Sequence, residues 1–185
     1  MLCMRLIANI DVLDDELLLG RITRTSIALL AGGAAITLFL ALLCEVGLGL
    51  VWWLWLCFLS VAALPVHELV HGAAFKLFVP GCRVSFGWQG AFLYTSANGA
   101  VMRRRSALLV LLAPAVVVTC ALVLLGLSLS GPALAAALAF FHLAGCTGDL
   151  AMVREILREP ACTHVRDTDL GIDLLSAFSD SELSE

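Results

Sequence analysis

Long apolar stretches separated by short polar joints make up most of the chain. Four stretches are each long enough to cross a bilayer, which takes about 20 mainly apolar residues; they cover about 26–48, 50–78, 106–127 and 133–157. Only GLGL separates the first two, and only SLSGP separates the last two, as in antiparallel helical hairpins. The pattern predicts an all-α integral membrane fold with four transmembrane helices.

The segment between the second and third stretches has a different character. Residues 82–101 are rich in glycine, aromatic and β-branched residues, and CRVSFGW and GAFLYTS flank a Gln-Gly turn. Short runs of this composition around a turn are typical of a β-hairpin. We predict a short β-hairpin-like segment here, at the cytoplasmic interface or dipping into it. The alternative is an unstructured connecting loop with interfacial aromatics.

Composition also indicates a lipid-embedded protein. Of the 185 residues, 61% are hydrophobic and 14% are charged, and the mean hydropathy is +1.01. Soluble domains have about 45–50% apolar and about 25% charged residues. The formal net charge of -4 is mild. The sequence has no basic patch with interleaved aromatics of the kind that would indicate nucleic-acid binding. We therefore expect membrane lipid as a partner and no nucleic acid.

The basic residues set the expected orientation. All eleven Lys and Arg lie in the N-terminal segment, around the central loop or near and beyond the end of the fourth stretch, and the two short joints carry none. Positive residues favour the cytoplasmic side. We predict a multi-pass cell-membrane protein with cytoplasmic termini, divided into an N-terminal segment (1–25), a membrane domain (26–158) and a C-terminal tail (159–185). Within the tail, DLGIDLLSAF is expected to form a short amphipathic helix.

The seven cysteines follow no close-spaced pattern, and no C-x-x-C pair occurs. Neither a ribbon-type zinc site nor a disulfide framework is therefore expected. Four of the cysteines fall inside the apolar stretches, where a thiol behaves as a small hydrophobe.

The motif HELVH in the second stretch places three ionisable residues in an apolar run. Helical residues four apart share a face, so His67 and His71 can present two imidazoles to one metal ion. Glu68 lies on the adjoining face, where it can accept a proton from a water that the metal activates. Pro65 predicts a kink just before His67, which suits a water-containing pocket. The alternative is a pair of histidines hydrogen-bonded across helices, with the glutamate lining a polar cavity.

A catalytic zinc site has three protein ligands and one open position, so a further ligand is expected elsewhere. At 1.5 Å per residue, His67 lies about 26 Å along its stretch and Asp149 about 24 Å along the fourth. Asp149 is the favoured third ligand, because a carboxylate at that depth is costly without a partner. Two alternatives stay open on the same stretch. His142 could be a hydrogen-bonded core histidine, a residue that supports a metal ligand, or a ligand itself. Cys146 could be a ligand, and its thiolate would make the site more like a structural zinc site.

Several segments together resemble the putative zincin peptidases, a family of small prokaryotic membrane proteins: HELVHGAAFKLF, RRRSALLVLLAP, AGCTGDLAMVREIL and VRDTDLGI. That family is similar to the site-2 proteases, intramembrane zinc metalloproteases with a His-Glu-x-x-His helix and an aspartate from a later helix. The resemblance implies a Zn²⁺ cofactor held by His67, His71 and Asp149, with Glu68 as the general base. It also implies that 82–101 is an edge hairpin on which an extended substrate pairs. The aspartate here stands in Gly-Asp-Leu, not Asp-Gly, and the upstream Asn-Pro signature of site-2 proteases is absent.

On this resemblance we expect an intramembrane zinc metallopeptidase that hydrolyses a peptide bond in or near the bilayer, with a membrane protein or peptide as substrate. Two other classes stay open. A non-catalytic metal-binding membrane protein, such as an ion carrier or a metal sensor, would keep the ligands and have no need of Glu68. A structural or assembly partner with a degenerate site would bind no zinc. Sequence alone indicates neither the substrate nor the oligomeric state.

Overall fold

The computed structural model describes residues 2–12, 15–89, 92–97, 99–168 and 171–179. This part of the chain is mostly helical, with short strands between and beyond the helices. The helices are α1 (Glu16–Leu43), α2 (Leu50–Phe78), α3 (Arg104–Ser130), α4 (Pro132–Gly145) and α5 (Thr147–Arg158). The strands are β1 (Leu2–Asp11), β2 (Ser85–Gln89), β3 (Phe92–Ser96), β4 (Val101–Arg103), β5 (His164–Asp167) and β6 (Gly171–Ser179).

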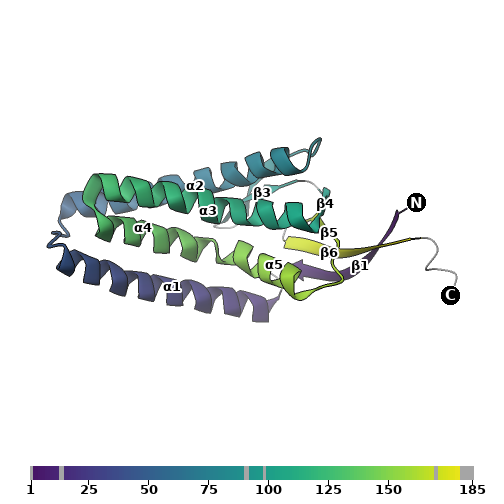
Figure 1. Ribbon diagram of the computed structural model, residues 1–185, viewed down its shortest axis with the longest axis horizontal. Coiled ribbons are helices and arrows are strands. Elements are labelled where there is room, and N and C mark those ends of the chain that lie inside the picture. The colour runs from purple at the N-terminus through teal and green to yellow at the C-terminus, as the bar shows by residue number, and fades with distance from the viewer. Residues whose placement is uncertain (1, 13–14, 90–91, 98, 169–170, 180–185) are drawn as a thin grey trace.

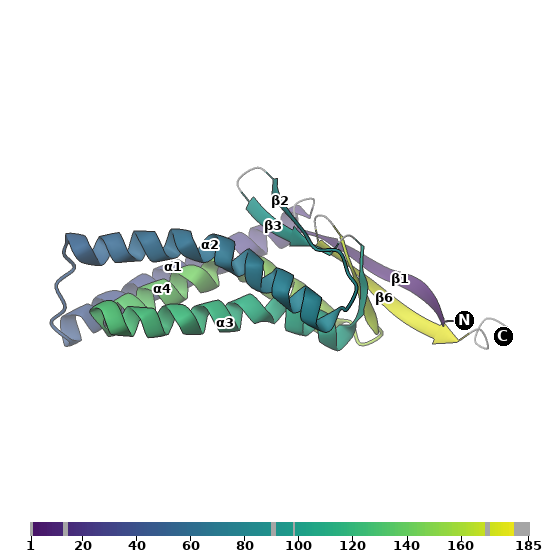
Figure 2. The same ribbon diagram turned by 90° about the horizontal axis from the view of Figure 1, so that it is seen from above.

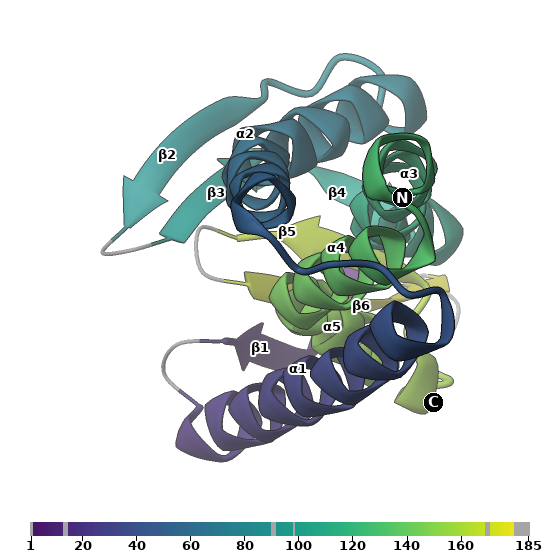
Figure 3. The same cartoon turned by 90° about the vertical axis from the view of Figure 1, so that its left-hand side faces the viewer.

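The long helices form an elongated bundle (Figure 1). α1, α2 and α3 are each long and apolar enough to cross a membrane, and α4 and α5 together pass the same test although they are bent by 57° at their joint. The described part of the chain therefore holds three or four candidate spans. Seen end-on, α4 lies between α1 and the pair α2 and α3 (Figure 3). The expectation of a mostly helical chain with helices able to cross a membrane is confirmed, and the exact four-span topology stays a prediction.

The predicted bounds are closest for α2, which runs Leu50–Phe78 as expected. α1 begins at Glu16, well before the apolar stretch at 26. The Asp15 carboxylate accepts hydrogen bonds from the backbone N–H groups of Leu17 and Leu18 at 2.9 and 3.0 Å, which is a helix N-cap. A polar cap therefore starts this helix inside the N-terminal segment that precedes the apolar stretch.

The stretch expected as one span over 133–157 is a bent pair of helices. α4 ends at Gly145, and α5 begins at Thr147. Glycine inside a helix costs about 1 kcal/mol relative to alanine, and Gly145 and Gly148 flank the joint. The break places Asp149 in the first turn of α5, where free backbone N–H groups favour a carboxylate.

A four-stranded antiparallel sheet lies at one end of the bundle, in the order β1-β6-β5-β4. β1 pairs with β6 from Leu2↔Ser179 to Asp11↔Gly171, so segments from both ends of the chain lie side by side (Figure 2). The part of DLGIDLLSAF that the structure describes is strand, so the helix expected there is wrong. An all-α fold is thereby corrected to a mostly helical fold with a small antiparallel sheet. The assignment of this end to the cytoplasm stays a prediction.

The β-hairpin expected between the second and third stretches is confirmed. β2 pairs antiparallel with β3 from Ser85↔Ser96 to Gln89↔Phe92, and β3 contacts α2. The expected Gln-Gly turn lies partly outside the described residues. Gly72 lets the hairpin approach α2 closely, because a Cβ at that position would lie 2.8 Å from the Phe86 ring.

Two apolar clusters form the interior. One lies within the bundle and includes Trp52, Ala63, Leu122, Leu134 and Leu138. The other joins α2, α3 and α5 to the sheet and includes Phe75, Val110, Ile156, Val165 and Leu174. Along α2, Ala63 belongs to the first cluster and Phe75 to the second. The HELVH motif therefore lies where the two apolar clusters meet.

Candidate metal centre

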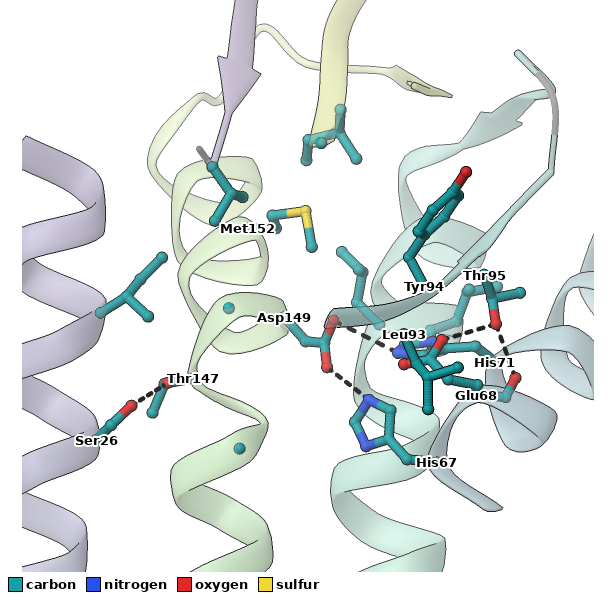
Figure 4. Close-up of a pocket in the computed structure, with 18 of the residues that line it drawn as sticks. Ser26, His67, Glu68, His71, Leu93, Tyr94, Thr95, Thr147, Asp149 and Met152 are labelled. Atoms are coloured by element: carbon teal, nitrogen blue, oxygen red, sulfur yellow. Dashed lines mark hydrogen bonds and ion pairs between the residues drawn. The ribbon is translucent and has the colours of Figure 1, made fainter. Parts of the chain in front are cut away.

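The two histidines of α2 lie on one face, as their spacing predicts. The ring centroids of His67 and His71 are 4.8 Å apart, and their side chains are 14% and 9% exposed. Both imidazoles are directed toward α5 (Figure 4). The helix thus presents two nearly buried nitrogen donors to one point.

Asp149 reaches that point from α5. One of its carboxylate oxygens lies 3.2 Å from His67 Nε2, and the other lies 3.4 Å from His71 Nε2. The side chain is 14% exposed. The structure therefore brings together the three residues that the sequence singled out as ligands, although Asp149 comes from a helix start and not from the middle of a span.

The spacing of these donors fits a zinc ion. One donor atom from each of His67, His71 and Asp149 lies within 4.8 Å of the others. A tetrahedral zinc with ligand bonds of about 2.0–2.1 Å holds its donors about 3.3 Å apart. One carboxylate oxygen lies 3.2 Å from the nitrogen of His67, and the other lies 3.4 Å from the nitrogen of His71. Two imidazoles and one carboxylate are also a donor set that hydrolytic zinc sites use. The three residues fit the metal.

A backbone carbonyl fixes the tautomer of His71. Its Nδ1 lies 3.1 Å from the Val110 oxygen, which can only accept, so Nδ1 carries the proton and donates it. Nε2 then faces the Asp149 carboxylate, and two acceptors meet unless a metal cation or a second proton lies between them. Metal-ligating histidines are commonly oriented in this way, through the ring nitrogen that does not bind the metal.

His142 of α4 supports His67 in a similar way. Its Nε2 lies 3.3 Å from His67 Nδ1, and its Nδ1 lies 2.9 Å from Thr119 Oγ1 in α3. A neutral His142 that donates from Nδ1 to Thr119 accepts the Nδ1 proton of His67, which leaves His67 Nε2 for the metal. Among the alternatives left open for His142, this contact favours support of a ligand.

Replacing His142 by alanine is expected to lower zinc affinity by about ten- to a hundredfold, because His67 loses the partner that orients its ring. Competition for zinc against a fluorescent chelator, with the detergent-solubilised protein, measures the change. His142→Gln, which keeps an acceptor, should recover part of the affinity. His164→Ala in β5 removes a histidine remote from this centre and is the control. Equal affinity in wild type and His142→Ala would contradict the supporting role.

Cys146 offers a second group of donors. Its thiol sulfur lies 3.8 Å from His67 Nδ1 and 3.7 Å from His142 Nδ1, and His67, His142 and Cys146 are spaced closely enough to hold an ion. This group shares His67 with the first. Cys146 is fully buried, and neither it nor His142 lines the adjacent cavity. A closed site of this kind suits a structural ion, whereas catalysis needs an open position.

Glu68 is held by the hairpin. Thr95 of β3 lies 2.7 Å from the Glu68 carboxylate and 3.0 Å from its backbone carbonyl, with the Thr95 hydroxyl as donor. One hydroxyl proton serves these two acceptors, and the contact fixes the carboxylate beside the histidine pair (Figure 4). Sequence reasoning assigned no role to Thr95. Its only signal was a polar residue in a segment expected to form a β-hairpin.

A cavity of about 520 Å³ opens in front of these groups. Its walls come from α1 to α5, β3 and the segment around β5 and β6. His67, Glu68, His71 and Asp149 all line it. Leu93 and Tyr94 of the hairpin face the same space (Figure 4). Proton-accepting and metal-ligating groups therefore share one pocket that is large enough for a short peptide segment.

A comparison with known protein families matches a region of the chain that contains all of these polar groups. The family model described as "Putative zincin peptidase" matches residues 60–164, more than half of the chain. Searches of curated proteins and of solved structures found no match.

Proposed function

The chain belongs to the putative zincin peptidase family, and on that premise we propose that it is an intramembrane zinc metallopeptidase that hydrolyses a peptide bond in or near the bilayer. One observation carries the proposal. The Glu68 carboxylate and the candidate ligands His67, His71 and Asp149 line the same cavity. Glu68 and both histidines lie on α2, which is apolar and long enough to span a membrane, and Asp149 lies on α5, which passes the same test only together with α4.

The ligands and the base have separate tasks in this mechanism. His67, His71 and Asp149 would hold the metal, which would act there as a Lewis acid that polarises a carbonyl and activates water at neutral pH. Glu68 accepts the proton of the attacking water and then passes it to the leaving amine. Thr95 keeps the carboxylate directed into the cavity through its 2.7 Å hydrogen bond.

The hairpin supplies a place for the substrate backbone. β2 and β3 form a two-stranded sheet in the described residues, and Leu93, Tyr94 and Thr95 of β3 line the cavity. An extended peptide that pairs with this hairpin by strand addition would run past Glu68. A helical substrate has to unwind first, because its carbonyls are occupied by its own hydrogen bonds.

The Glu68 contact favours an enzyme over a metal carrier or sensor. A carrier needs the three ligands only, and a carboxylate held beside them by Thr95 would have no task. An assembly partner with a degenerate site needs neither the donor spacing of 3.2 and 3.4 Å nor the cavity.

Removal of the metal tests the proposal directly. The protein, purified and reconstituted in nanodiscs, is incubated with a library of single-span peptides, and the products are identified by mass spectrometry. Cleavage is expected to fall to background after treatment with a zinc chelator and to return when one equivalent of zinc is added. Zinc binding without any chelator-sensitive cleavage would favour the carrier or sensor, and a protein that binds no zinc would favour the assembly partner.

A further inference from the structure

A second concave site lies between α1 and α5, apart from the candidate centre. This groove has a volume of about 510 Å³. Its walls are two facing helical stripes that consist of Leu18, Arg21, Ile22, Arg24 and Thr25 on α1, with Thr147, Leu150, Ala151 and Arg154 on α5. The groove shares only Ile22 and Thr147 with the larger cavity. None of the candidate ligands lines it.

Three guanidinium groups give the groove a positive charge. Arg21 and Arg24 are exposed, and among the described residues neither has a carboxylate within ion-pair distance. Arg24 is held along its helix by a 3.0 Å hydrogen bond from Nε to the Gly20 carbonyl. Arg154 lies 3.3 Å from Glu155, a carboxylate that also lies 3.7 Å from Arg158. The groove therefore keeps an excess of cationic donors.

The deeper wall of the groove is apolar. Leu18 is 4% exposed, and Ile22, Leu150 and Ala151 are half-buried. A small inorganic anion has no apolar surface to bury against this wall, whereas a lipid has an anionic headgroup joined to an apolar body. The combination of the two surfaces favours a lipid over free phosphate.

The groove also lies at the expected depth for a headgroup. From Ser26 onward α1 turns apolar and exposes large side chains, such as Ile27 at 59% and Leu38 at 54%. Toward its N-terminus the same helix carries Arg21 and Arg24. Basic residues just beyond a membrane helix attract anionic headgroups, and basic pockets between helices bind them.

We propose that this groove binds the headgroup of an anionic phospholipid. The phosphate oxygens accept charge-assisted hydrogen bonds from Arg21, Arg24 and Arg154, which guanidinium groups form with two oxygens at once. The glycerol and upper acyl chains lie on Ile22 and on the exposed apolar face that α1 presents from Ser26 onward. This site does not depend on peptidase activity.

Native mass spectrometry of the full chain in detergent, with phosphatidylglycerol or phosphatidylcholine of identical acyl chains, tests the proposal. Wild type is expected to bind phosphatidylglycerol more tightly. The triple variant Arg21→Gln, Arg24→Gln, Arg154→Gln should lose about ten- to a hundredfold of that affinity. The matched control Arg103→Gln, Arg105→Gln, Arg158→Gln removes the same charge outside the groove and should retain it. Zinc content checks that both variants are folded.

Three results would overturn the proposal. Equal affinity of wild type for the two lipids would show that no anionic-lipid site exists. An equal loss in both triple variants would indicate general surface charge instead of a groove. Displacement of phosphatidylglycerol by an equal concentration of inorganic phosphate would show that the site recognises the free anion and that the apolar wall contributes nothing.

Discussion

Replacing Asp149 by alanine is expected to reduce zinc affinity by more than about a hundredfold, because loss of a mere supporting contact already costs about ten- to a hundredfold. The carboxylate is the donor that lies against both imidazoles, at 3.2 and 3.4 Å, so its removal leaves only two nitrogen donors. Metal analysis after dialysis against a weak chelator, followed by a competition titration, measures the change.

The fold should survive this substitution. A carboxylate in the first turn of a helix contributes about 0.3–1 kcal/mol through the helix dipole, which is a small part of the stability of a packed domain. Glu155→Ala on α5 is the matched control, since it removes a carboxylate that pairs with Arg154 and Arg158 away from the cavity. Retention of zinc in Asp149→Ala, with loss in Cys146→Ala, would move the ion to the group formed by His67, His142 and Cys146.

The long apolar helices could be predicted from the sequence, because an apolar run of that length has few alternatives to a helix if it crosses lipid. α2 is the clearest case, with an apolar run that starts after Gly49 and matches the helix bounds. The break at Cys146 could not be read in the same way. Hydropathy averages over about 19 residues, so a bend of 57° does not register inside a stretch whose two helices together still pass as one span.

The sheet was missed for a different reason. β1 and β6 pair across almost the whole chain, from Leu2↔Ser179 to Asp11↔Gly171, and no local pattern signals a partner so far away. β6 is also buried at four successive positions, 172–175. A strand with both faces covered loses the alternation that identifies it, and DLGIDLLSAF was therefore predicted as a short amphipathic helix.

Some of the site residues could be predicted from the sequence, and others could not. His67, Glu68 and His71 form a motif with fixed helical spacing. Asp149 was selected by counting depth along 133–157 as one helix; the structure places it near the histidines through the break between α4 and α5, which that count did not include. Thr95, Thr119 and the Val110 carbonyl act through tertiary contacts. Nothing in a threonine or a backbone carbonyl distinguishes it in a sequence from others of its kind.

Replacing Glu68 by glutamine is expected to abolish cleavage while zinc stays bound. Glutamine keeps the size of the side chain and an acceptor for the Thr95 hydroxyl, but it cannot take a proton from water. Loss of general acid–base catalysis costs about 10²–10⁴-fold in rate, so kcat should fall by that factor with little change in zinc affinity. Cleavage of a library peptide and zinc content are measured on the same preparation.

Thr95→Val provides the graded comparison, because it keeps the Glu68 carboxylate and removes the hydrogen bond at 2.7 Å. A hydrogen bond to a charged group is worth about 1.5–3 kcal/mol, so a loss of about tenfold or more in kcat is expected, with zinc content unchanged. Activity should fall from wild type to Thr95→Val and further to Glu68→Gln. That order would show that the hairpin positions the general base. Full cleavage by Glu68→Gln would show that the Glu68 carboxylate is not the general base. The three ligands without a required base would then favour a metal carrier or sensor.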